Sequence, residues 1–331
     1  MACRFTSRFD SDYRGDPTRG GSAVSRTTVR ARRSSRTPGA LSLLLVLAAG
    51  PALAVECGDV ITGHARLDRD LICTTDPALT VDGGSLDLGR FTVVCDHAPP
   101  MPSVGVLLEG SGARLRGGAI TGCAVAVWVG GAGDHIVRGV TASASNQGVF
   151  VESDGNRLLH SHVLRGLDDA AVQVDGSDNR LNFNDVTGSS DQGFEINGNG
   201  NRIVGNRIGG VAEGVQLAGD GNHVVLNQII GTTDRGVEVR AGAHVITFNL
   251  IADGAADGIA LLDDGDGNRV SRNAIYGHPD QGLFVGTFDN TLERNRVLLN
   301  GVDVTDATPG CDDNLWRDNT FETSVSDDCV Q

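Results

Sequence analysis

Residues 193–214 read GFEINGNGNRIVGNRIGGVAEG, and this stretch decides the fold. It holds two apolar residues, Phe194 and Ile196, then a Gly/Asn turn, then a second apolar run that opens at Ile203. A lone asparagine and a third apolar position at Ile208 follow before glycine leads into the next copy. Apolar and polar residues alternate along each run, as in a strand with one buried face. Because a single copy could not bury that face alone, the pattern predicts a solenoid.

The same pattern recurs through most of the chain. Its copies align on a first small residue at Gly105, Ala126, Gly148, Ala171, Gly193, Gly214, Gly236, Gly258, Gly282 and Gly301. The period is about 22 residues, and three short strands in each copy predict an all-β, single-stranded parallel β-helix of about ten coils. Leucine-rich repeats overlap in length, but their Leu-x-x-Leu-x-Leu framework is absent.

Four columns of this alignment are apolar, and we expect them to stack inside the helix. The first strand supplies two columns, and the second and third strands supply one each. The columns are Val149, Val172, Phe194, Val215, Val237, Ile259, Leu283 and Val302; Val151, Val174, Ile196, Leu217, Val239, Leu261, Val285 and Val304; Leu158, Leu181, Ile203, Val224, Ile246, Val270 and Leu292; and Val163, Val186, Ile208, Ile229, Ile251, Ile275, Val297 and Phe321.

Asparagine is the second periodic signal. Pairs five residues apart recur at Asn179/Asn184, Asn201/Asn206, Asn222/Asn227, Asn268/Asn273, Asn290/Asn295 and Asn314/Asn319, and Ser161 and Asn249 continue the second column. Asparagine tolerates left-handed backbone, and its amide can bond its own turn and the next copy. We therefore expect these residues to be structural.

The charge balance excludes two classes of partner. The chain has 27 Lys+Arg and 42 Asp+Glu, and every basic residue is Arg because the sequence contains no Lys. Removing the nine Arg and three Asp of residues 1–54 leaves 18 basic and 39 acidic residues, a net charge of 18 − 39 = −21. Such an acidic surface argues against nucleic acid and anionic membranes, and it is compatible with cations or neutral glycans.

The N-terminal segment has the layout of a secretory signal. Several arginines precede the apolar run LSLLLVLAAG (41–50), and a small-x-small sequence ends at Ala54. The run has about half of the ~20 residues that a membrane span needs. We expect cleavage after Ala54, no membrane span in the mature chain, and a secreted, periplasmic or cell-surface location. The chain then divides into a leader (1–54), N-terminal capping coils (55–104) and the β-helix (105–331).

The exported part carries six cysteines, which lie near its two ends. Export into an oxidising compartment favours disulfides, and sequence proximity favours Cys57–Cys73, Cys95–Cys123 and Cys311–Cys329 among the 15 possible connectivities. Staples at the ends are useful because end coils lack a neighbour. A zinc site is the alternative, but no two cysteines have the usual short ligand spacing.

Strand, Gly/Asn turn, Asn-Arg-apolar, lone Asn, apolar residue and Gly, in that order, resemble the right-handed parallel β-helix repeat. Pectin-lyase-like enzymes, mannuronan epimerases and the periplasmic copper-binding protein of nitrous-oxide reductase maturation share that repeat. The opening CGDVITGHARLDRDLIC, followed by LTVDGGSLDLGRFTV, is similar to the start of many secreted β-helix proteins. The resemblance covers about residues 55–318. It implies a right-handed helix and, as in pectin-lyase-like enzymes, a substrate along the outer face of the first sheet.

On that face the resemblance points to an acidic groove. The candidate catalytic residues are Asp169, Asp191, Glu195 and Glu238, with Asp234 beside them, and the candidate substrate-binding residues are Phe150, Gln173, Gln216, Arg240 and Phe284. Two carboxylates ~5 Å apart suit a retaining glycosidase, and ~6.5–9.5 Å suits an inverting one. Asp168-Asp169 partly matches a polygalacturonase motif, but the Gly-His-Gly motif and lysine of those enzymes are absent. A lyase would need a basic residue, and Arg240 is the expected candidate.

A second candidate site binds a cation. Asp264, Asp266 and Asn268 alternate with glycine in LLDDGDGN, and such oxygen donors suit calcium. The same spacing also serves a plain turn, so we expect no required cofactor and keep calcium as an option.

The sequence predicts an exported, monomeric β-helix that binds polysaccharide or a cell-surface glycan. Whether it also cleaves that glycan, as a hydrolase or lyase, stays open. The alternative is a non-catalytic structural or surface-adhesion solenoid. An enzyme would bring at least two of the candidate carboxylates together with perturbed pKa values, whereas a scaffold would leave them dispersed.

Overall fold

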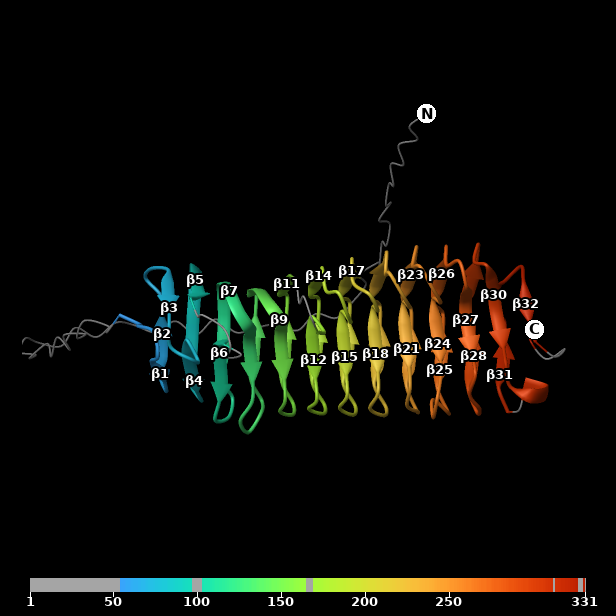
Figure 1. The fold of residues 1–331 in the computed structure, drawn as a ribbon. Helices are drawn as coiled ribbons and strands as arrows, with labels where there is room; N and C mark the ends of the chain where they lie inside the picture. Colours follow the sequence, from blue (N-terminus) through green and yellow to red (C-terminus); the bar gives the residue numbers. More distant parts are fainter. Residues whose placement is uncertain (1–53, 97–102, 165–168, 312, 327–329, 331) are drawn as a thin grey trace, which may run out of the picture. The chain divides into compact units, whose positions relative to one another are not determined.

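The chain folds into a right-handed parallel β-solenoid of about 12 turns (Figure 1). The computed structural model describes residues 54–96, 103–164, 169–311, 313–326 and 330. The expected leader lies almost wholly outside these residues. All the described strands pair in parallel, and the one short helix is a 3-10 turn, η1 (Pro309–Cys311).

The strands form three stacks, and each coil contributes one strand to each stack. The first stack contains β1 (Val60–Ile61), β4 (Leu79–Asp82), β6 (Val104–Glu109), the ends of β7 (Arg114–Val129) and β9 (Thr141–Val151), β12 (Val172–Val174), β15 (Phe194–Ile196), β18 (Val215–Leu217), β21 (Val237–Val239), β24 (Ile259–Leu261), β27 (Gln281–Val285), β30 (Val302–Asp306) and β32 (Ser324–Val325).

The second stack begins after the first turn of each coil. It contains β2 (His64–Arg66), the starts of β5 (Ser85–Cys95) and β7, β8 (Ile136–Arg138), β10 (Arg157–Leu159), β13 (Arg180–Asn182), β16 (Arg202–Val204), β19 (His223–Val225), β22 (Val245–Thr247), β25 (Arg269–Ser271), β28 (Thr291–Glu293) and β31 (Leu315–Arg317).

The third stack completes each coil. It contains β3 (Leu71–Cys73), the end of β5, the middle of β7, the start of β9, β11 (His162–Leu164), β14 (Asp185–Thr187), β17 (Arg207–Gly209), β20 (Gln228–Ile230), β23 (Leu250–Ala252), β26 (Ala274–Tyr276) and β29 (Arg296–Leu298).

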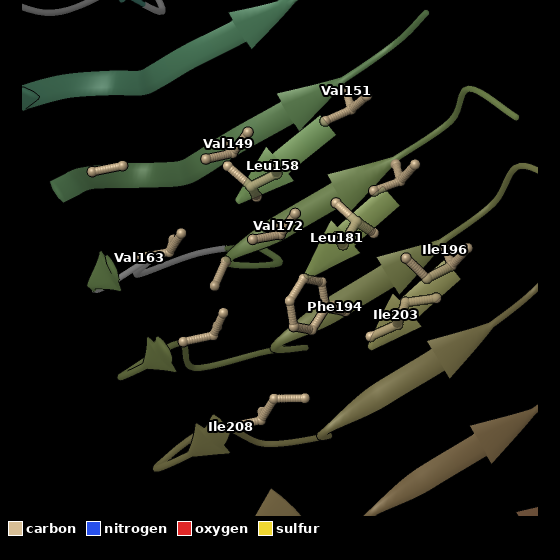
Figure 2. Close-up of a cluster of buried hydrophobic side chains, with 14 of the residues drawn as sticks. Val149, Val151, Leu158, Val163, Val172, Leu181, Phe194, Ile196, Ile203 and Ile208 are labelled. Atoms are coloured by element: carbon tan, nitrogen blue, oxygen red, sulfur yellow. The ribbon is translucent and has the colours of Figure 1, made fainter. Parts of the chain in front are cut away.

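The predicted apolar columns form the core. Phe194 lies in register between Val172 and Val215, and all three side chains are fully buried. Figure 2 shows the columns from the three stacks meeting in the interior. Like side chains that stack in successive coils give a continuous core although no coil is thick enough to form one alone.

The helix has about two more coils than we expected. Strands β1 to β5 continue all three stacks into the segment predicted to hold irregular capping coils. The sequence pattern is weaker there because β5 is one long strand of 11 residues that bends through two stacks.

The expected register of the last full coil is wrong by two residues. Phe284 pairs with Thr305, not with Asp303, and Val302 is only half-buried. Asp303 occupies the small-residue column, since a Cβ on Gly282 would lie 2.7 Å from the Asp303 carbonyl oxygen. The true spacing from Gly282 is therefore 21 residues, and Gly301 misled the alignment because it is another glycine nearby.

The asparagines form two internal ladders. In each, a side-chain Oδ1 accepts a hydrogen bond from the backbone N–H of the equivalent residue one coil earlier, for example Asn206 Oδ1 from Asn184 N at 2.8 Å. Histidine replaces asparagine at two positions of the first ladder, where Nδ1 of His135 and of His244 accepts the same bond. The prediction that the asparagines are structural is confirmed.

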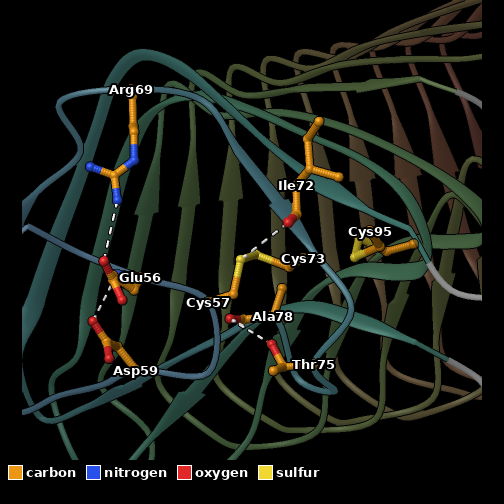
Figure 3. Close-up of a disulfide and its surroundings, with 10 residues drawn as sticks. Glu56, Cys57, Asp59, Arg69, Ile72, Cys73, Thr75, Ala78 and Cys95 are labelled. Atoms are coloured by element: carbon orange, nitrogen blue, oxygen red, sulfur yellow. Dashed lines mark hydrogen bonds and ion pairs between the residues drawn. A yellow bond between two sulfur atoms is a disulfide. The ribbon is translucent and has the colours of Figure 1, made fainter.

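Disulfides lie in the N-terminal coils, as expected. Cys57 bonds Cys73 and Cys95 bonds Cys123, which removes the zinc alternative for these four residues (Figure 3). The third expected pair, Cys311–Cys329, falls on side chains outside the described part. Within the described residues no helix is long and apolar enough to cross a membrane.

Candidate functional site

One row of side chains along the outer face of the first stack carries the candidate residues. The register places Trp128, Phe150, Gln173, Glu195, Gln216, Glu238, Ala260 and Phe284 in successive coils. Their neighbours along each strand are the fully buried core residues. The row itself ranges from half-buried to fully buried, and Glu238, which Arg235 from the preceding turn covers, is its most buried charged member.

Asp169, Asp191 and Glu195 form what we call the acid cluster. Asp191 precedes Glu195 by four residues in one coil, and Asp169 occupies the position of Asp191 in the coil before. Ser189 joins the two turns: its hydroxyl donates to the Asp169 carbonyl oxygen at 2.8 Å and accepts from the Asp191 N–H at 3.1 Å. The backbone thus fixes the two aspartates in adjacent coils.

Amides, not cations, surround the acid cluster. Gln147 Nε2 donates to Asp169 Oδ2 at 3.0 Å, and Asn197 Nδ2 donates to Glu195 Oε1 at 3.3 Å. Among the described residues, no arginine or histidine lies within ion-pair distance of Asp169, Asp191 or Glu195. Within the described part of the chain, the three carboxyls therefore experience one another's charge with amides, not cations, as partners.

Burial and mutual repulsion act on these carboxyls in the same direction. Burial raises the pKa of Glu195, the Asn197 amide opposes this, and the charges of Asp169, Asp175 and Asp191 raise the pKa further. Burial also raises the pKa of Asp191, and the charge of Asp169 adds to the effect. Carboxyl groups whose pKa is raised towards neutral pH in this way can act as proton donors or acceptors.

An aromatic pair lies beside the acid cluster in the same row. The rings of Trp128 and Phe150 meet edge to face, with centroids 5.2 Å apart, and Trp128 Nε1 donates to Glu152 at 3.1 Å. Only Gln173 separates Phe150 from Glu195 in the row. Trp128 was missed in the sequence, although its place 22 residues before Phe150 could have revealed it.

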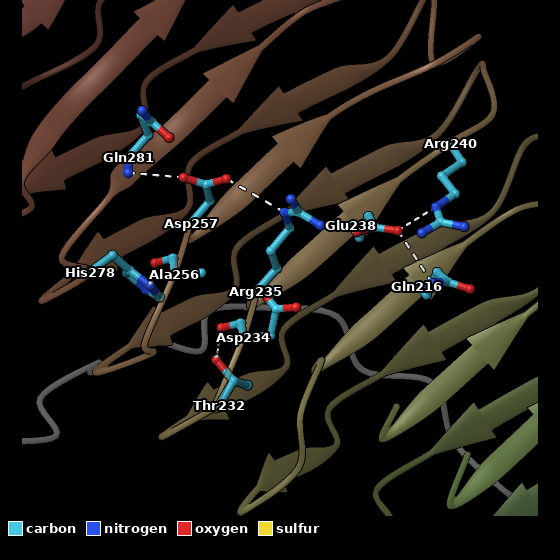
Figure 4. A network of polar contacts seen from close by, with 10 residues as sticks. All are labelled: Gln216, Thr232, Asp234, Arg235, Glu238, Arg240, Ala256, Asp257, His278 and Gln281. Atoms are coloured by element: carbon cyan, nitrogen blue, oxygen red, sulfur yellow. Dashed lines mark hydrogen bonds and ion pairs between the residues drawn. The ribbon is translucent and has the colours of Figure 1, made fainter. Parts of the chain in front are cut away.

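Glu238 belongs to a different environment. Its side chain is fully buried and forms ion pairs with Arg235 and Arg240, while Gln216 Nε2 donates to its Oε1 at 3.2 Å (Figure 4). Arg235 also reaches Asp257 at 3.5 Å. We expected Arg240 to be the only basic residue on this face. That is wrong, because Arg235 folds onto the face from the preceding turn.

A polar column directly before the small residues was also missed. It contains Gln147, Gln192, Glu213, Arg235, Asp257 and Gln281. From Gln192 onward, the carbonyl oxygen of each of these residues accepts a hydrogen bond from the N–H of the small residue one coil earlier. Burial raises the pKa of Glu213, the charge of Glu238 raises it further, and Gln216 Nε2 donates to it at 3.1 Å. Asp257 belongs to this column, because it lies one residue before its small residue, whereas Asp191 and Asp234 lie two residues before theirs.

The expected single groove thus consists of two parts. The acid cluster, with Gln173 and Phe150, is an uncompensated set of half-buried carboxyls. Glu238, with Gln216 and Arg240, is part of a neutralised ion-pair network two coils further along. Phe284 lies two coils beyond Glu238, so it belongs to neither part.

The proposed calcium ligands have other partners. Asp266 Oδ1 accepts from the Phe288 N–H at 2.8 Å, and Asn268 occupies the first asparagine ladder, where its Oδ1 accepts from the His244 N–H. Asp264 lies exposed in the same turn. In the described part of the chain, no three His, Cys, Asp or Glu residues gather as a metal site would require.

Two family models match this chain, each over less than half of it. The right-handed β-helix region matches residues 192–327, and the periplasmic copper-binding protein NosD matches residues 96–234. Among the described residues no group of ligands fits copper. His135 and His244, both buried in the first asparagine ladder, accept backbone N–H bonds and lie five coils apart, so they do not converge. Curated protein sequences give no match.

Solved structures share the fold at low identity. The Dettilon tailspike protein has a TM-score of 0.60 at 15% identity, covering 79% of this chain and 61% of that one. ORF18 of Geobacillus virus E2 has a TM-score of 0.50 at 9% identity, covering 72% and 53%. Pectate lyase Pel9A has a TM-score of 0.46 at 14% identity, covering 78% and 70%. This chain spans less than two thirds of the length of the first two, and the likeness shows the fold alone.

Proposed function

We propose, from the premise that this chain is a right-handed parallel β-helix repeat protein, that it is exported and binds extracellular polysaccharide over the acid cluster. The two disulfides support an oxidising compartment outside the cytosol. The observation that carries the proposal is the gathering of Asp169, Asp191 and Glu195 with no cation beside them among the described residues; burial and then their mutual charge raise the pKa of Asp191 and Glu195. Carboxyl groups whose pKa is raised by burial and by neighbouring carboxylates cluster at functional sites.

The site supports processing of the glycan as well as binding. A carboxyl with a raised pKa can protonate a glycosidic oxygen, and a neighbouring carboxylate can activate water or stabilise positive charge on the sugar. The Trp128–Phe150 pair offers an apolar surface on which a sugar ring can pack beside these groups. Glu195 is our candidate acid, because it is the most strongly surrounded by carboxylates.

Hydrolysis is favoured over elimination at this position. A lyase needs a basic side chain near the sugar carboxylate, and the two arginines that the described residues place on this face, Arg235 and Arg240, are paired with Glu238. The alternative function, a non-catalytic adhesion solenoid, would use the same face without turnover.

A glycan screen with a product assay tests the proposal. The exported chain should bind at least one polysaccharide on an array and release new reducing ends from it. Glu195→Gln should lower turnover about 100-fold or more, as expected for loss of a general acid, while leaving binding largely intact. Binding without turnover would support adhesion, and full activity in Glu195→Gln would remove this site.

A further inference from the structure

The outer face of the second stack carries an unusual row of arginines. Arg157, Arg180 and Arg202 are Cα partners in three successive coils, and His223 continues the row in the fourth. All three arginines are exposed. Successive coils are ~4.8 Å apart, and like charges directly opposite each other in a sheet destabilise it. Nothing in the repeat requires arginine at these positions.

The three arginines of this row have no ion-pair partner within 4 Å among the described residues. Arg114 and Arg138, nearer the N-terminal end of this face, also have no ion-pair partner among the described residues, whereas two other arginines of the face are paired. Arg116 pairs with Asp87 at 2.9 Å near one end, and Arg269 pairs with Glu293 towards the other. The middle of the face is therefore a cationic strip in a region whose net charge is −21 (18 basic against 39 acidic residues in 55–331).

The surface next to this strip favours an extended ligand. The neighbouring row across the strands holds Leu159, Asn182 and Val204, with no carboxylate. Beyond it, the rings of His160 and Phe183 stack with centroids 5.3 Å apart, and 56% of Phe183 is exposed. Both residues adopt left-handed backbone, which bulky side chains rarely do, so the stacked pair is held outward at a conformational cost.

We propose that the arginine row Arg157–Arg180–Arg202 binds a linear, carboxylate-bearing polysaccharide that runs along the helix axis. Guanidinium groups pair with carboxylates through two parallel hydrogen bonds, which a row of arginines at coil spacing can repeat along a polymer. The stacked rings of His160 and Phe183 provide an apolar platform for a sugar face at the edge of the strip. The choice of a polysaccharide as the ligand rests on the proposed function. The arginine row itself lies on a different face from the acid cluster.

Charge density favours this polymer over nucleic acid. Two acidic residues, Asp154 and Asp178, lie in the turns that directly precede Arg157 and Arg180. These aspartates and the strongly acidic remainder of the surface repel a nucleic acid duplex, which carries a phosphate charge on every nucleotide of both strands. A polyuronate carries one charge per sugar and can place it between the flanking carboxylates.

Binding of a polyuronate to the full chain tests the proposal. Calorimetric titration with a polyuronate oligomer should give an affinity that falls as salt rises. Arg157→Gln/Arg180→Gln/Arg202→Gln should weaken it by about tenfold or more, since each exposed pair contributes modestly. The corresponding triple Lys variant, which keeps the charge but not the fork, should give an intermediate affinity.

Arg269→Gln is the matched control, because Arg269 lies in the same row but is paired with Glu293. It should bind like the wild type. Asp191→Asn/Glu195→Gln separates this proposal from the proposed function: it should lose turnover but keep the salt-sensitive binding. Equal affinity in the triple Gln variant, or tighter binding of single-stranded DNA or a neutral glucan than of the polyuronate, would overturn the proposal.

Discussion

Glu195 and Glu238 occupy the same row of the same strand stack, yet their neighbours give them opposite characters. Glu238 is fully buried between Arg235 and Arg240, so its charge is neutralised. Glu195 faces Asp169 and Asp191 with only amides for partners. The difference comes from two positions per coil: Arg235 and Arg240 flank Glu238, whereas Gln192 and Asn197 stand at the equivalent positions around Glu195.

Removing one carboxylate from the acid cluster should release the other. Asp191→Asn abolishes a negative charge that raises the pKa of Glu195, so the Glu195 pKa should fall towards its ordinary value. A shift in the pH optimum of turnover to lower pH reports the change. Asp185→Asn, on the third stack, is the control and should leave the optimum unchanged; an unchanged optimum in Asp191→Asn would contradict the coupling.

His244 makes the fold sensitive to acid. Its Nδ1 accepts the Asn222 N–H, and burial lowers its pKa from 6.5 to about 4. Between those values the unfolded chain binds a proton that the folded chain does not, so stability is lost as pH falls through this window. The free energy of unfolding should decrease by about 3 kcal/mol from this residue.

His244→Asn should flatten that dependence, since asparagine is the ladder residue of the neighbouring coils. Urea denaturation at pH 7 and pH 4.5 measures it. The exposed His64→Asn should behave as the wild type does. Equal losses of stability in the wild type and His244→Asn would count against this explanation.

At the scale of the element, the ladders hold the turns of successive coils in register. Asn206 Oδ1 accepts from Asn184 N at 2.8 Å, and its Nδ2 donates to Leu181 O at 2.8 Å. Asn206→Ala would leave the buried Asn184 N–H without an acceptor, so we expect a loss of about 3 kcal/mol in urea denaturation.

Asn199 supplies the matched control for this prediction. Its Oδ1 also accepts a backbone N–H, from Asp220 at 2.7 Å, but the bond is exposed, so water can replace it. Asn199→Ala should cost less than about 1 kcal/mol. Similar costs for the two variants would mean that burial of the ladder is not what makes it stabilising.

The repeat made the elements predictable, while cross-coil contacts of long side chains did not follow from it. Phe194 and Asn206 could be assigned because each position recurs every 22 residues or so and needs only its equivalent above and below. Arg235 was missed, and Asp303 was placed in the wrong register. The first acts through a side chain that folds onto the next strand, and the second replaces glycine in a column defined by glycine.

The described coils are stabilised one by one through their neighbours, and disulfides reinforce the N-terminal coils. The Cys95–Cys123 disulfide closes a separation of 28 residues and should contribute about 3–4 kcal/mol. In Cys95→Ser/Cys123→Ser, hydrogen exchange should accelerate in β5 to β7, because each coil contacts only its neighbours. The central strands β21 to β24 should keep their protection. Uniform loss along the chain would contradict a coil-by-coil account.

The central claim places function in the acid cluster, and carbon-13 NMR titration of its carboxyl groups tests it most directly. In the wild type, Glu195 and Asp191 should titrate above the ordinary range of Glu and Asp. Adding the polysaccharide identified by the screen should shift both midpoints. Ordinary midpoints that ignore the glycan would contradict the account.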